Sequence, residues 1–209
     1  MGATMFVSPL FLSTVVAESK EKNNGFHCGI QGLKITQGGG TGSVDPRHMK
    51  DFQINCGLIG HSDERRSGMT LETMLQTLDC VPDNVTVLIC VGETDPSLKA
   101  MDIFYREVEK IASKIVTKNF VTYVTYEPQW LISTNKDEQS LISHADAVRH
   151  CTATILKIKE ITSTNRILYG GSVSEFSPQE LHQFDVEGFL IGSLSTKPVE
   201  LGKFINSLI

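Results

Sequence analysis

The sequence predicts an α/β fold, a (β/α) barrel, and three observations support that prediction. Short apolar, β-branched runs alternate with helical patterns along the 209 residues. The runs are continuously apolar, which is typical of parallel strands covered on both faces. Polar residues collect where the runs end, and (β/α) barrels place their sites at the carboxyl ends of their strands. We therefore expect a single domain over residues 1–209.

Seven runs have the composition of strands. They cover residues 4–8, 26–31, 56–60, 85–91, 121–126, 166–170 and 188–191. A complete barrel has eight strands and ~250 residues, so we expect a barrel that is short by one strand–helix unit.

Helical patterns fill the intervals between these runs. Residues 96–117 place apolar side chains at helical spacing, and residues 140–160 and 198–208 suggest two further helices. Another helix is expected to start at Ser177, because Ser suits the N-cap, Pro178 suits the first position and Glu180 completes a capping box.

Composition and charge narrow the function classes. Hydrophobic content of 40%, charged content of 21% and a net charge of −5 describe an ordinary globular protein and argue against nucleic-acid or acidic-membrane partners. A small anionic substrate remains possible, because backbone N–H groups bind phosphate without a basic patch. No run approaches the ~18 apolar residues of a membrane-spanning helix.

The cysteines indicate a reducing compartment. Their number is odd and they share no metal-ligand spacing, so we expect a cytoplasmic protein without a metal or other cofactor. The five are Cys28, Cys56, Cys80, Cys90 and Cys151. The apolar run at residues 6–17 has no basic residues ahead of it and is interrupted by Pro9, which argues against a signal peptide.

Two apolar runs end in a side chain suited to acid–base chemistry. Glu127 closes the run 121–126, and Pro128 biases it toward extended backbone, so its carboxylate is aimed beyond the strand edge. His61 closes the run 56–60. Taken alone, the first pattern also fits a solvated strand-end turn, and the second also fits a core histidine.

Together the strand ends resemble the triosephosphate isomerase family, in the family's order and at close to its spacing. The motifs are Gly60-His61-Ser62, Cys90-Val91-Gly92-Glu93, Tyr126-Glu127-Pro128-Gln129-Trp130 and Tyr169-Gly170-Gly171-Ser172. The resemblance implies a (β/α)8 TIM barrel lacking its first strand–helix unit. It also implies interconversion of dihydroxyacetone phosphate and glyceraldehyde 3-phosphate by enediol proton transfer, in glycolysis and gluconeogenesis.

The resemblance assigns roles to particular residues. Glu127 would be the base, and His61 would be a neutral electrophile beside a helix N-terminus, an arrangement for which this family is the standard example. The triose phosphate would be held by backbone amides, and four further residues would support the site. The phosphate-binding residues are Ser133, Ser172, Gly192 and Ser193, and the supporting residues are Ser62, Glu93, Tyr169 and Gly171.

Several positions depart from the family pattern. The lysine motif of the family's first strand has no counterpart, and serines or asparagine replace three loop glycines, at Ser133, Asn135 and Ser193. One residue is inserted after Ser62, so either Asp63 or Glu64 could take the place of the family's glutamate.

The resemblance also implies a homodimer, formed through a glycine-rich run. It lacks the ending of a phosphate-binding P-loop, and the resemblance implies a loop that reaches into a second subunit, with Thr41 near its tip. The run consists of Gly38, Gly39, Gly40, Thr41 and Gly42.

Two functional hypotheses follow. The first is an active triosephosphate isomerase. The second is a catalytically impaired relative that acts as a binding or interaction protein, which the departures from the pattern would favour. Another sugar-phosphate barrel enzyme is a weaker alternative, because the motif around Glu127 does not suit it.

Overall fold

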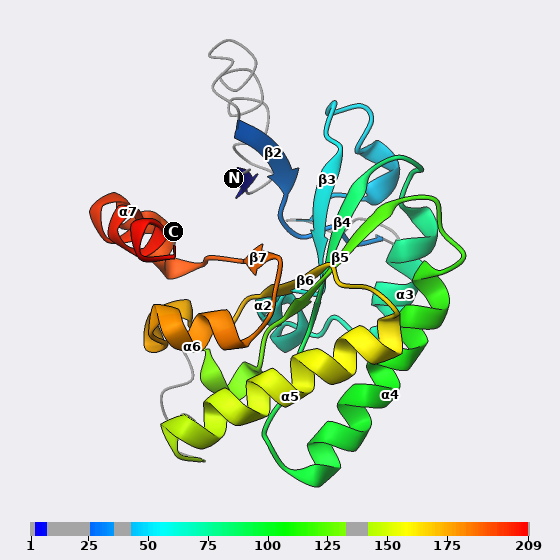
Figure 1. Cartoon of the computed structure of the whole chain (residues 1–209). Coiled ribbons are helices and arrows are strands. Elements are labelled where there is room, and N and C mark those ends of the chain that lie inside the picture. The colour runs from blue at the N-terminus through cyan, green and yellow to red at the C-terminus, as the bar shows by residue number, and fades with distance from the viewer. Residues whose placement is uncertain (1–2, 8–25, 36–42, 133–141, 209) are drawn as a thin grey trace. The chain divides into compact units, whose positions relative to one another are not determined.

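The structure is a computed structural model that describes residues 3–7, 26–35, 43–132 and 142–208 (Figure 1). Its seven strands form one sheet in sequence order, and the pairs β1–β2, β2–β3, β3–β4, β5–β6 and β6–β7 are parallel. The strands are β1 (Ala3–Val7), β2 (Phe26–Ile30), β3 (Cys56–Ile59), β4 (Thr86–Val91), β5 (Val121–Tyr126), β6 (Ile167–Tyr169) and β7 (Gly188–Phe189). Each strand overlaps one of the seven predicted runs, although β6 and β7 are shorter than predicted, so the prediction of parallel strands is confirmed.

From β3 onward each strand is followed by at least one α-helix, as expected of a (β/α)8 barrel with one unit fewer. They are α2 (Ser62–Arg66), α3 (Leu71–Cys80), α4 (Leu98–Ile115), α5 (His144–Thr162), α6 (Pro178–Gln183) and α7 (Pro198–Ser207). Short 3-10 helices are η2 (Pro46–His48), η3 (Gln129–Leu131), η4 (Val173–Glu175) and η5 (Ser193–Thr196). The predicted capping box at Ser177 is present. No helix in the described ranges is long and apolar enough to cross a membrane.

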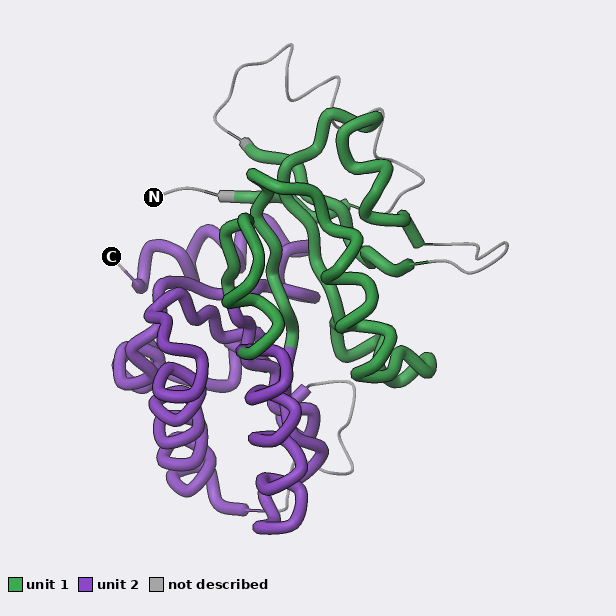
Figure 2. Tube along the Cα trace, turned by 90° about the vertical axis from the view of Figure 1, so that its right-hand side faces the viewer, with its two compact units in different colours: residues 1–90, 113–123 green, residues 91–112, 124–209 purple. Residues whose placement is uncertain are grey.

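The chain divides into two compact units, coloured separately in Figure 2. Unit 1 contains residues 1–90 and 113–123, and unit 2 contains residues 91–112 and 124–209. The elements β4, α4 and β5 each begin in one unit and end in the other.

Unit 1 has an aliphatic core from its parallel strands and α3. Its fully buried side chains include Ile30, Leu33, Met49, Ile59, Met74, Leu78 and Ile89. These continuous apolar runs exclude water from the sheet, so the polar groups of unit 1 are left at the strand ends.

Unit 2 has an aromatic core that begins at the last residue of β5. The ring centroids of Tyr126 and Tyr169 lie 6.1 Å apart, and Tyr169 lies 4.8 Å from Phe184. Phe176 lies 5.2 Å from Phe184, with the two rings nearly perpendicular. Offset and edge-on aromatic packing is directional, so this cluster sets the positions at which β5 and β6 end.

Candidate active site

Glu127 follows the last residue of β5 and is almost completely buried, with 2% of the residue exposed. Its backbone N–H donates to the Val91 carbonyl at 2.7 Å. Glycines lie against it on two sides. A Cβ at Gly92 would lie 1.8 Å from the Glu127 carbonyl oxygen, and a Cβ at Gly170 would lie 2.8 Å from the Glu127 Cγ. Glu127 is therefore a closely confined carboxylate, and a solvated strand-end turn does not describe it.

Glu93, two residues beyond β4, ties the neighbouring strand ends and helix α5 together. Its Oε1 accepts from the Tyr126 hydroxyl at 2.8 Å, from the Trp130 Nε1–H at 2.8 Å and from His150 Nε2 at 3.0 Å. The Glu93 backbone carbonyl accepts from the Gln129 N–H at 3.0 Å. These contacts bracket Glu127, because they hold residues on both sides of it in the sequence.

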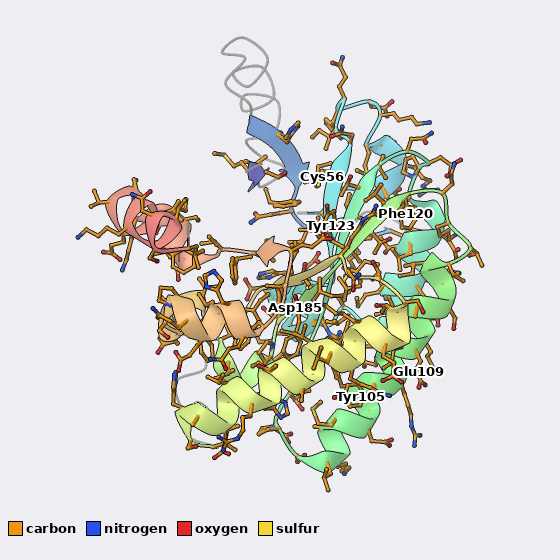
Figure 3. The ribbon with its side chains drawn as sticks, in the orientation of Figure 1. Cys56, Tyr105, Glu109, Phe120, Tyr123 and Asp185 are labelled. Atoms are coloured by element: carbon orange, nitrogen blue, oxygen red, sulfur yellow. The ribbon has the colours of Figure 1, made fainter. Side chains whose placement is uncertain are left out.

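The hydroxyl and thiol groups around Glu93 are kept neutral. Burial raises the pKa of Tyr126 and of Tyr169 well above the ordinary value, and the Glu93 charge adds to both shifts. Burial and the Glu93 charge also raise the pKa of the Cys151 thiol. The pKa of Tyr105 on α4 (Figure 3) is raised by burial first, with a further contribution from Glu93. The Glu93 carboxylate therefore accepts from an uncharged hydroxyl and an uncharged indole, and its third contact is the His150 imidazole.

In unit 1, His61 follows β3 and forms the N-cap of the short helix α2. Its Nδ1 accepts from the Asp63 backbone N–H at 3.2 Å, and its side chain is 34% exposed. The Asp63 carboxylate lies 3.6 Å from the same nitrogen. The shorter contact with the amide requires a lone pair on Nδ1, so we assign the proton of the neutral ring to Nε2.

Glu64 holds the turn that presents His61. Its carboxylate accepts from the Gly60 N–H at 3.1 Å and also from the backbone N–H of His61. Burial raises the pKa of Glu64, and these two amide hydrogen bonds oppose the increase. Gly60 has φ of +74°, which other residues adopt at a cost. Of the two acidic residues left open by the sequence, Glu64 folds back against the strand end, whereas Asp63 pairs with Arg66.

The predicted phosphate-binding residues of unit 2 lie at the starts of two 3-10 helices. Ser172 is the N-cap of η4, and Gly192 is the N-cap of η5, in which Ser193 is the first residue. Ser172 is partly buried, whereas Gly192 and Ser193 are exposed. Each of these helices starts four residues after the end of a strand, η4 after β6 and η5 after β7, and presents its N-terminal backbone amides there.

The supporting residues lie in buried surroundings. Ser62 is 3% exposed at the start of α2, and Gly171 is also buried. Ser133 and Thr41, with the glycine-rich run 38–42, lie outside the described residues. Within the described ranges, no group of three or more His, Cys, Asp and Glu side chains could hold a metal ion.

For three residues of the site, the contacts could not be predicted from the sequence. The contact between His150 and Glu93 joins positions 57 apart, and no local pattern distinguishes His150 from an ordinary helix residue. The role of Glu64 depends on which way its side chain turns. Gly170 belongs to a motif that was noticed, but its contact with Glu127 depends on β5 and β6 being neighbours.

Comparison with known proteins identifies the chain's relatives. The family model described as triosephosphate isomerase matches residues 2–208. The triosephosphate isomerase of Geobacter metallireducens is 32% identical over 180 residues, which cover 81% of this chain and 71% of that protein. The glycosomal triosephosphate isomerase of Trypanosoma cruzi is 30% identical over 202 residues, covering 92% and 80% of the two chains. The triosephosphate isomerase of Debaryomyces hansenii is 31% identical over 200 residues, covering 90% and 78%.

The parallel sheet with polar strand ends defines a protein of the (β/α)-barrel class, with a buried carboxylate after one strand and an imidazole after another. Within that class, the chain belongs to the triosephosphate isomerase family.

Proposed function

We propose that this chain is a triosephosphate isomerase that interconverts dihydroxyacetone phosphate and D-glyceraldehyde 3-phosphate. The observation that carries the proposal is Glu127, a carboxylate confined at the end of β5 in a member of this family. The family match and the names of the relatives favour the isomerase over the binding or interaction protein.

Glu127 acts as the base in this proposal. Isomerisation removes a proton from the carbon beside the substrate carbonyl and returns a proton to the neighbouring carbon. One carboxylate can perform both transfers, because the two carbons are adjacent and the enediol between them is planar. A carboxylate screened from water abstracts such a proton more readily than a hydrated one, and Glu127 is 2% exposed.

His61 acts as the electrophile. Its Nδ1 is occupied as an acceptor by the Asp63 amide, so the neutral ring offers Nε2–H as a donor. A hydrogen bond from that group to the substrate oxygen stabilises the negative charge that develops on it in the transition state. Glu64 and Gly60 hold the turn in which His61 lies.

The substrate phosphate is held by backbone amides in this proposal. The starts of η4 and η5, at Ser172 and at Gly192 and Ser193, support it, because N-terminal amides of a helical turn suit an anion. Ser133 contributes from outside the described residues. No cofactor takes part in the proposed reaction.

Assembly and location belong to the same proposal. We propose a cytoplasmic homodimer formed through the run 38–42, and equilibrium sedimentation at the mass of one 23.0 kDa chain would contradict the dimer. We also propose that the two units form one domain. In that case, unfolding curves followed by circular dichroism and by Trp130 fluorescence should show a single, coincident transition.

The direct test is a coupled assay of the purified chain with glyceraldehyde 3-phosphate. Glu127→Asp withdraws the carboxylate by about one bond length, so kcat should fall on the order of 10²-fold while KM changes little. Glu187→Asp is the matched control, because Glu187 is an exposed residue of the same unit. An unchanged kcat in Glu127→Asp would remove Glu127 from the mechanism.

A further inference from the structure

The carboxylate of Glu93 is asymmetrically bonded. Its side chain is 0% exposed. Oε1 accepts from three groups on three elements, namely Tyr126, Trp130 and His150. Oε2 is buried and has no hydrogen-bond partner within the described part of the chain. The position of this carboxylate therefore depends on the three donors that converge on one oxygen.

His150 differs from the other two donors because it can carry a positive charge. A tyrosine hydroxyl and an indole N–H are neutral, and a buried carboxylate without a charged partner is costly. The His150 side chain is 17% exposed, and its Nε2 lies 3.0 Å from Glu93 Oε1. Its ring lies edge-on to Trp130, with the centroids 5.5 Å apart. The imidazole therefore contacts both the carboxylate and another of its donors.

Glu93 connects this histidine to the segment that contains Glu127. Tyr126 directly precedes Glu127, and Trp130 follows it by three residues. Backbone hydrogen bonds add to the side-chain contacts, because the Gln129 N–H donates to the Glu93 carbonyl and the Glu127 N–H donates to the Val91 carbonyl. A displacement of the Glu93 side chain would therefore also displace Tyr126 and Trp130, which lie on either side of Glu127 in the sequence.

We propose that His150 is a positioning residue for Glu127, a role that rests on the isomerase function proposed above. His150 supplies the third hydrogen bond that orients the Glu93 side chain. Glu93 then holds Tyr126 and Trp130, and these two residues fix the peptide between them. Without His150, Oε1 of Glu93 would keep only two of its three donors, so its side chain would be held less firmly.

Two substitutions test the role in the intact chain. His150→Leu keeps the bulk but removes the hydrogen-bond donor, and kcat should fall on the order of 10-fold with KM within about twofold. His150→Gln can place an amide N–H near Glu93 Oε1. Its kcat should therefore lie between that of the wild type and that of His150→Leu. His182→Leu is the control, because His182 is exposed on α6. Wild-type kcat in His150→Leu would overturn the proposal.

A double-mutant cycle separates this coupling from a general loss of packing. In a Glu93→Gln background, His150→Leu should change kcat much less than it does in the wild type, because the carboxylate that His150 contacts is already gone. Equal losses in both backgrounds would show that His150 does not act through Glu93 and would contradict the proposal.

The sole tryptophan gives a readout that does not depend on activity. Trp130 is the one Trp of the sequence, and its indole contacts both Glu93 and His150. Its emission should change in His150→Leu and remain unchanged in His182→Leu. Identical emission in His150→Leu and the wild type would overturn the contact between His150 and Trp130.

A wild-type chain without isomerase activity would instead overturn the proposed function, and with it the positioning role of His150. An active wild type with an unaffected His150→Leu variant would overturn the positioning role alone.

Discussion

Glu127 is confined mainly by residues that have no side chain. Gly92 lies against its backbone carbonyl, and Gly170 lies against its side chain, where a Cβ would be 2.8 Å from Cγ and 3.2 Å from Oε1. The same Cβ at Gly170 would lie 2.8 Å from Thr125 Cγ2. These distances leave no room for a methyl group, so the position of the carboxylate depends on the absence of one.

Gly170→Ala should therefore displace Glu127. Overpacking of this kind costs about 1–3 kcal/mol of stability, and the displaced carboxylate should lower kcat at the same time. Gly202→Ala in α7 is the matched control, because a Cβ there meets nothing within 4 Å, and replacing a helical glycine by alanine should stabilise the fold by about 1 kcal/mol. Urea unfolding and the coupled assay on both variants measure the two effects. Wild-type kcat in Gly170→Ala would show that the carboxylate tolerates the methyl group.

At the scale of elements, the strands could be predicted because continuous apolar runs depend only on local sequence. Helix α6 could be predicted for the same reason, since the Ser177 capping box lies within four residues. Helix α3 was missed, although Thr70 caps it and Leu71, Met74 and Leu78 recur at helical spacing. The contacts of Glu93 could not be predicted, because they join β4, β5 and α5 through residues distant in the sequence.

The contact between α3 and the end of α4 gives a prediction for pH dependence. Asp79 accepts from Lys114 at 2.5 Å and from Lys118 at 2.6 Å, and these hydrogen bonds lower the pKa of its carboxyl. Because the folded pKa lies below the unfolded value of about 3.9, the stabilisation is complete above that value and is lost as the pH falls through the folded pKa.

Asp79→Asn should therefore reduce stability at pH 7 and have little effect at low pH. The side chain of Asp79 is 47% exposed, so solvent screens the pair and the loss should stay below about 1 kcal/mol. Urea unfolding at pH 7 and near pH 2.5 measures the free energy of unfolding of both proteins. As a control, 1 M salt at pH 7 should reduce the difference in stability between the wild type and Asp79→Asn. A difference that persists at low pH would show that the charge of Asp79 is not its source.

At the scale of the whole molecule, the class of fold followed from the alternation of seven strands with helices, and the family followed from four motifs in order. Neither inference required any contact to be known. The environment of each site residue could not be predicted in the same way. The burial of Glu127 and the tautomer of His61 depend on neighbouring elements and backbone amides, whose positions the sequence does not state.

The central claim is that this molecule removes and returns a substrate proton through Glu127. The measurement that tests it most directly is nuclear magnetic resonance of dihydroxyacetone phosphate incubated with the chain in deuterated water. With the wild type, deuterium should enter the triose phosphate at the carbon that exchanges its proton, as glyceraldehyde 3-phosphate forms. With Glu127→Gln, which keeps the shape of the side chain but removes the base, labelling should fall at least on the order of 10²-fold. Equal labelling by the two proteins, or none by the wild type, would contradict the account.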